Sequence, residues 1–235
     1  MPLSRKQFVS AAAIGVSAAA IGLEPAAAEA APARTPVHFH ILTPSQYNRA
    51  AMMRVLNAGG ANKQVFQSVD PILIAPGIAS LYMHMQNSMN AYQFSLGTGK
   101  LSTLGVILGP SIVLALNDNV WKKYSFGKAF KLANTNAYYA ASSNLNLGAS
   151  ADDPNGVYQD WSAQAVLKRG GNFFVCHNAM TGVAAVLSSK IPGTTPAGVL
   201  ADFEKNILPG FIVVPAGVAA IQQAQEHGWK PFPII

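Results

Sequence analysis

The sequence predicts an α/β fold, a three-layer α/β/α arrangement around a mostly parallel sheet, with an N-terminal extension and a long surface excursion. Apolar runs of strand length alternate along the chain with small-residue helical patterns. Three of these runs pass into the next helix through a short turn: Leu108-Gly109-Pro110, Val175-Cys176-His177-Asn178 and Val214-Pro215-Ala216-Gly217. Strands that alternate with helices favour a parallel sheet covered on both faces, so the three turns should meet along one edge of that sheet.

The first thirty residues have the three parts of a secretory signal peptide. Met1 to Lys6 is a short basic region, Val9 to Leu23 is apolar, and Ala26 to Ala30 holds two A-x-A cleavage candidates. Ser4 to Val9 resembles a twin-arginine motif in which Lys6 stands where the second Arg is normal, so both the Sec and the Tat route stay open. The apolar stretch is shorter than the roughly 20 residues of a membrane span. We therefore expect a periplasmic or secreted protein with no stable membrane insertion after cleavage.

The rest of the chain predicts one domain. Residues 31–62 are interpreted as a linker and N-terminal extension, and residues 63–235 as the α/β domain with an insertion around residues 120–156. Apolar runs predict strands at Val37–Leu42, Lys63–Val69, Leu104–Leu108, Phe173–Val175 and Phe211–Val214, and an edge strand within Trp229–Ile235. Helical spacing and capping residues predict helices at Ser45–Leu56, Ile78–Phe94, Gly109–Leu116, Val157–Arg169, Ala179–Leu187, Thr195–Asn206 and Val218–His227.

The insertion differs in composition from its surroundings. Trp121, Tyr124 and Phe126 are large apolar anchors, whereas 134–153 is rich in Asn, Ala, Ser and Asp. Long loops of this kind usually act as functional lids or pack against another subunit.

Charge and cysteine content narrow the function classes. The 235 residues hold 16 Lys and Arg against 10 Asp and Glu, a formal net charge of +6. The basic residues are scattered and do not interleave with aromatic residues, so we expect no nucleic-acid partner. The chain has one cysteine, which cannot form an internal disulfide. An odd thiol in an exported protein is a reactive group, an intermolecular link or an inert buried group.

That cysteine, Cys176, falls at the predicted end of a strand and start of a helix. Ligands of open α/β sheets bind at the carboxyl ends of the strands, and the positive end of a helix dipole stabilises a thiolate. His177 is adjacent in sequence and is a candidate to assist the thiol. Gly109, Pro110, Asn178, Pro215 and Gly217 are the candidate ligand-binding residues of the three turns. A buried structural cysteine is the competing interpretation.

At these residues the sequence resembles the DsrE-like family of small α/β sulfur-handling proteins. The likeness covers roughly Lys63 to Ile235, and it is most specific at Val175 to Met180, Val213 to Ala219 and Gln225 to Trp229. The resemblance implies a three-layer α/β/α fold, assembly into homo- or hetero-oligomers and, in several members, a cysteine at the position of Cys176 that carries sulfur as a persulfide. By that likeness we expect a persulfide carrier, sulfurtransferase-like if it is an enzyme, that needs no cofactor and whose partner is a small sulfur-containing anion or a protein thiol. Export, the segment before Lys63 and the insertion depart from the family pattern.

A non-catalytic small-ligand or metal-binding protein is the alternative. His38 and His40 fall on one face of a predicted strand, and Met83, His84, Met85 and Met89 include soft thioethers that suit Cu(I). Methionine at helical spacing is more commonly core filling. The sequence lacks a Ser-His-Asp pattern, paired carboxylates, a Walker loop and G-x-G-x-x-G, so neither hydrolysis nor nucleotide chemistry is indicated.

Overall fold

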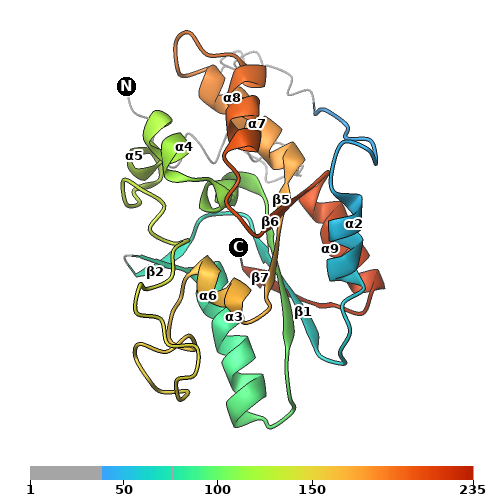
Figure 1. The fold of residues 1–235 in the computed structure, drawn as a ribbon. Helices are drawn as coiled ribbons and strands as arrows, with labels where there is room; N and C mark the ends of the chain where they lie inside the picture. The colour runs from blue at the N-terminus through green and yellow to red at the C-terminus, as the bar shows by residue number, and fades with distance from the viewer. Residues whose placement is uncertain (1–38, 76, 235) are drawn as a thin grey trace, which may run out of the picture.

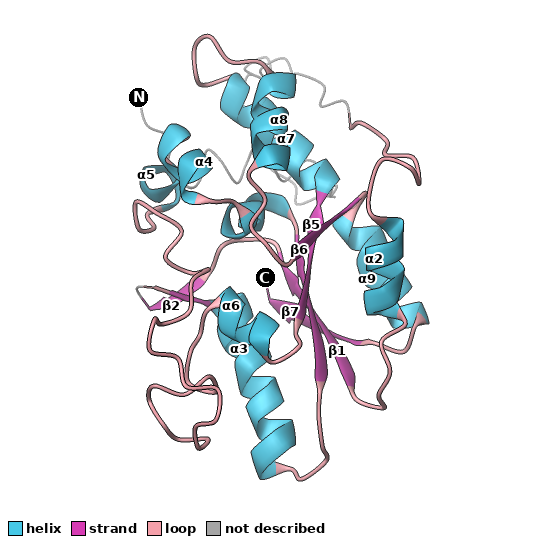
Figure 2. Cartoon of the chain, in the orientation of Figure 1, coloured by secondary structure: helices cyan, strands magenta, loops and turns pink. Residues whose placement is uncertain are grey.

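The protein folds around a parallel five-stranded sheet with helices on both faces (Figures 1 and 2). The computed structural model describes residues 39–75 and 77–234, so the predicted signal peptide and His38 lie outside the described residues. The strand order is β6-β5-β4-β1-β7, with every neighbouring pair parallel. The α/β/α fold class predicted from the sequence is confirmed. The strands are β1 (Lys63–Ser68), β4 (Ser102–Ile107), β5 (Asn172–Cys176), β6 (Phe211–Val214) and β7 (Lys230–Ile234).

Side chains alternate between two cores because successive strand residues point to opposite faces of the sheet. Phe173 and Val175 of β5 belong to one core, whereas Phe174 and Cys176 belong to the other. Figure 1 shows the helices of the second core, α2 (Arg49–Leu56) and α9 (Gly217–Glu226), on one side of the sheet. The opposite face is covered by α3 (Ser80–Asn90), α7 (His177–Ser188) and α8 (Pro196–Lys205), together with the 3-10 helix Gly109–Ala115.

The insertion is anchored in the core through its aromatic residues. It includes α4 (Asp118–Lys123) and α5 (Phe126–Phe130), and it continues as irregular chain to the short helix α6 (Ala163–Lys168). Trp121, Tyr124 and Phe126 are buried as predicted, and the indole N–H of Trp121 donates to the carbonyl of Val113 (2.8 Å).

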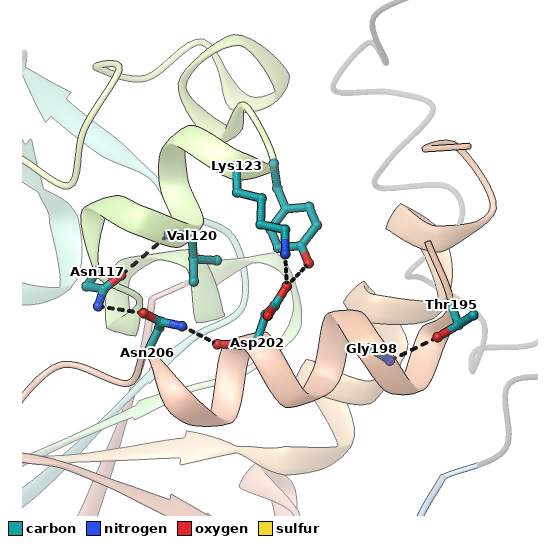
Figure 3. A network of polar contacts seen from close by, with 8 residues as sticks. Asn117, Val120, Lys123, Thr195, Gly198, Asp202 and Asn206 are labelled. Carbon is teal, nitrogen blue, oxygen red and sulfur yellow. Dashed lines mark hydrogen bonds and ion pairs between the residues drawn. The ribbon is translucent and has the colours of Figure 1, made fainter. Parts of the chain in front are cut away.

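Helix α8 is fastened to α4 by a polar network (Figure 3). Lys123 and Tyr124 both donate to Asp202, and the side-chain amides of Asn117 and Asn206 are joined (2.9 Å). Thr195 caps the start of α8 by accepting from the N–H of Gly198 (3.1 Å). The insertion is thus held at its first end by α8.

Five predicted elements differ from the structure. Residues 39–42 are not a strand, since they lie outside the sheet with Phe39 and Ile41 exposed. The helix predicted from Ser45 begins only at Arg49, because the Asn48 side chain caps it by accepting from the N–H of Ala51 (2.9 Å).

The helix predicted at Val157–Arg169 is reduced to Ala163–Lys168. The Asp160 carboxylate accepts from the backbone N–H groups of Ser142 and Ser162, and the Ser162 hydroxyl caps α6. These side-chain bonds hold the preceding residues in a turn, as Asp and Ser do when they compete with helical hydrogen bonding.

The helix predicted at Ile78–Phe94 is also divided. Ile78 and Ala79 form β3, which pairs with β2 (Leu73–Ala75) in a two-stranded antiparallel sheet. α3 follows and ends in a π-helical turn at Ala91–Ser95. The segment predicted as a helix from Gly109 is the 3-10 helix. Among the described residues, no helix is both long enough and apolar enough to span a membrane.

Candidate functional site

The three strand-to-helix turns are in contact at the carboxyl end of the sheet. β4, β5 and β6 are neighbours, so their turns lie side by side. The N–H of Asn178 donates to the carbonyl of Pro215 (3.2 Å). A Cβ on Gly217 would lie only 3.1 Å from Cβ of Cys176 and 3.2 Å from Cβ of Leu108. Glycine at this position therefore lets the start of α9 pack directly on the cysteine.

Cys176 is the last residue of β5 and the N-cap of α7. Its Sγ accepts a hydrogen bond from the backbone N–H of Ala179 (3.3 Å), so the sulfur faces the first turn of a 12-residue helix. The residue is 5% exposed and packs in the core beneath α2 and α9, next to Phe174 and Val214. The sulfur therefore has a backbone donor and little exposure to solvent.

His177 turns away from the thiol. Its ring is 1% exposed, and Nε2 lies 3.0 Å from a carboxylate oxygen of Glu204 on α8. Nδ1 is buried and has no hydrogen-bond partner. The imidazole consequently makes no hydrogen bond to Cys176 in this conformation, and it acts as a bridge between α7 and α8.

The N-terminal extension approaches the same end of the sheet. The ring of His40 lies edge-on to that of His177, with 6.2 Å between their centroids. His40 also contacts the side chain of Gln46 (3.3 Å). Two imidazoles thus meet beside the start of α7.

The candidate copper ligands of the alternative interpretation lie on α3 in different surroundings. Met85 and Met89 are buried in the core, and the sulfur of Met89 accepts from the hydroxyl of Thr103 (3.6 Å). His84 lies against Phe232 of β7. Within residues 39–75 and 77–234, no three His, Cys, Asp or Glu side chains are grouped so that they could hold a metal ion.

Gly109 and Pro110 join the ends of two strands. Gly109 has a positive φ of 56°, and a Cβ there would lie 2.9 Å from the carbonyl oxygen of Val69, which follows β1. The hydroxyls of Ser68 and Ser111 are 2.8 Å apart and buried. The turn after β4 is therefore packed against β1, with a buried hydroxyl pair beneath it.

A second set of residues at the opposite end of the sheet was not predicted. Gln93, Lys100, Tyr158 and Arg169 line a cavity of about 450 Å³ where β4 and β5 begin. They come from two segments that are distant in sequence, 93–100 and 158–169, and share no motif. The available signal was a composition pattern: a basic pair at Lys168 and Arg169 directly before Gly170 and a strand.

Comparison with family models, with curated proteins and with solved structures gives no match for this chain.

Proposed function

We propose that this chain is an exported sulfur- or thiol-handling protein that carries sulfur on Cys176 as a persulfide. One observation carries the proposal: the thiol sulfur accepts the N–H of Ala179 at the first turn of α7. Backbone N–H groups and the helix dipole at such a position stabilise an anionic sulfur. The likeness to DsrE-like proteins at Val175 to Met180 points to the same residue.

The transfer needs one thiolate and no cofactor. The Cys176 thiolate attacks the outer sulfur of a donor persulfide R–S–SH, the donor S–S bond breaks, and R–S⁻ leaves as Cys176–S–SH forms. The reverse attack by an acceptor thiolate returns Cys176 to its starting state, so the cycle involves no net oxidation. Because the chain has a single cysteine, both exchanges are intermolecular.

The cover over Cys176 favours a protein partner. Cys176 is 5% exposed, so a donor would need a local shift of the packing around the residue to reach the sulfur. A docking protein thiol can supply the binding energy for that shift, whereas a small anion supplies less. Assembly into a homo-oligomer remains a prediction, which light scattering of the purified protein tests.

The test is persulfide loading of the native protein. After incubation with a low-molecular-weight persulfide, intact-mass measurement should show the added mass of one sulfur atom, removable by a thiol reductant. The Cys176→Ser variant should gain no such mass. His177→Gln should load like the wild type, because the imidazole does not contact the sulfur. A thiol that stays unmodified in the folded protein and reacts only in denaturant would refute the carrier function.

A further inference from the structure

The cavity at the amino end of the sheet lies opposite Cys176. Lys100 lies two residues before the start of β4, and Arg169 lies three residues before the start of β5. Leu147 and Tyr158 of the irregular chain between α5 and α6 form another part of its wall. Its volume of about 450 Å³ is in the range of small-molecule sites, which is about 300–1,000 Å³.

Arg169 is fixed in this wall by neutral groups only. Its Nη1 donates to the side-chain oxygens of Gln86 and Asn90 (2.6 Å for Asn90), and its Nη2 donates to that of Gln93 (3.1 Å). The guanidinium lies over the ring of Tyr158, 4.7 Å from the ring centroid. Within the described parts of the chain, no carboxylate forms an ion pair with Arg169.

A guanidinium has five N–H donors, and these contacts use three of them. The Nε–H and one Nη2–H of Arg169 therefore have no partner among the described residues. Burial lowers the pKa of Arg169 from its ordinary value, which reflects the cost of holding this charge away from water. An anion that accepted the remaining donors would offset that cost, since carboxylates pair with Arg through two hydrogen bonds.

Two further cations line the same cavity. Lys100 and Lys168 are exposed, and the ammonium of Lys100 lies 3.2 Å from the position that a Cβ on Gly170 would occupy. Among the residues that the structure describes, no acidic side chain lines the cavity. The Asp160 carboxylate nearby along the chain is occupied by two backbone N–H groups. The site consequently has an excess of positive charge that favours an anionic ligand.

Apolar groups cover the rest of the wall. The buried side chains of Met89 and Leu101 line the cavity. Leu147 of the insertion also lines it and is 58% exposed. The π-helical turn Ala91–Ser95 carries Gln93 to the guanidinium, and π-helical turns are frequent at functional sites. A bare inorganic anion would leave this apolar surface unused.

We propose that the cavity binds a small organic carboxylate with an apolar body. Arg169, Lys100 and Lys168 face the carboxylate, and Leu147 and the ring of Tyr158 cover the apolar body. The insertion then has a role, because it closes a binding site at the end of the sheet remote from Cys176.

Titration calorimetry of the purified protein with octanoate tests the proposal, with octanol and inorganic phosphate as comparison probes. Octanoate should bind saturably, more tightly than either comparison probe. The double variant Lys100→Gln/Lys168→Gln should weaken octanoate binding by about tenfold, since it removes two exposed charges that each attract the carboxylate modestly. The matched variant Lys128→Gln/Lys190→Gln removes two exposed lysines that do not line the cavity and should leave binding unchanged.

Each opposite result would overturn the inference. If octanoate does not bind saturably, the cavity is not a carboxylate site. If the two double variants bind octanoate with equal affinity, Lys100 and Lys168 do not contribute and the cavity is not the site. Octanol binding as tightly as octanoate removes the need for a carboxylate, and phosphate binding as tightly removes the need for an apolar body. The Cys176→Ser variant should bind octanoate normally, so this result is independent of the sulfur-carrier proposal.

Discussion

Replacement of Gln86 by Met is the strongest test of how the insertion is attached. Gln86 is fully buried on α3, and its side-chain amide nitrogen donates to the backbone carbonyls of Val157 (2.9 Å) and Asp160 (2.7 Å). Its side-chain oxygen accepts from Arg169. A single side chain thus pairs with two carbonyls of the insertion and with the guanidinium at the cavity wall.

Methionine has a similar size and no donor or acceptor that can replace the amide. A buried carbonyl left without a partner costs about 1–3 kcal/mol, and a hydrogen bond to a charged group contributes about 1.5–3 kcal/mol. Asp160 is only half-buried, so water relieves part of its loss. We expect Gln86→Met to lower the free energy of unfolding by about 3–5 kcal/mol, and Tm by about 6–20 °C for a chain of this size. Urea denaturation followed by circular dichroism, together with a thermal melt, measures both quantities.

The matched control is Gln93→Met. Gln93 accepts from the same guanidinium through Nη2, but it is exposed and has no buried carbonyl partner. We expect a change of less than about 1 kcal/mol, because solvent replaces the lost contact. If Gln86→Met costs no more than Gln93→Met, the insertion is not held by Gln86 and the structural argument for the cavity wall is wrong.

Two further predictions concern packing and pH. Gly105→Ala in β4 should destabilise the fold by about 1–3 kcal/mol, because the added methyl group would lie within 3.0 Å of the Phe173 ring. Gly182→Ala in α7 has open space around the new methyl group and should stabilise the fold by about 0.5–1 kcal/mol. Thermal melts that rank the two variants in the opposite order contradict this prediction. The pKa of Asp202 is lowered from its ordinary value, chiefly by the hydrogen bond from Lys123. The ionised Asp202 carboxylate therefore stabilises the fold above about pH 4, and this stabilisation is lost as the pH falls through the lowered pKa. The wild type should therefore lose more stability than Asp202→Asn between about pH 5 and pH 2, and parallel urea-denaturation profiles would refute that assignment.

The sheet was predictable because its signals are local. Lys63–Val69 and Phe211–Val214 are short segments bounded by turn residues, and both form strands within one residue of the predicted bounds. The break at Cys176 is also local: a run buried on both faces ends there, and α7 starts at His177. Parallel pairing of β4, β5 and β6 then brings the three turns together, as the alternation of strands and helices implied.

The insertion was less predictable because its structure depends on distant partners. Apolar spacing alone favoured a helix from Val157, but Asp160 pairs with Ser142, and Gln86 of α3 holds the Val157 and Asp160 carbonyls. The cavity was not predicted for the same reason, because its cations come from segments that meet only in the folded chain. The direction of the His177 ring likewise depends on Glu204, 27 residues away.

The two ends of the sheet differ in what they require of a ligand. At the carboxyl end, Cys176 is 5% exposed and packs close to Gly217, so the proposed sulfur loading would depend on local opening. At the amino end, the cavity is already formed and charged. Mild urea, below the unfolding transition, should therefore speed persulfide loading of Cys176 and weaken octanoate binding. Local opening should help persulfide loading and harm octanoate binding. If urea changes both in the same direction, the argument for two separate sites is wrong.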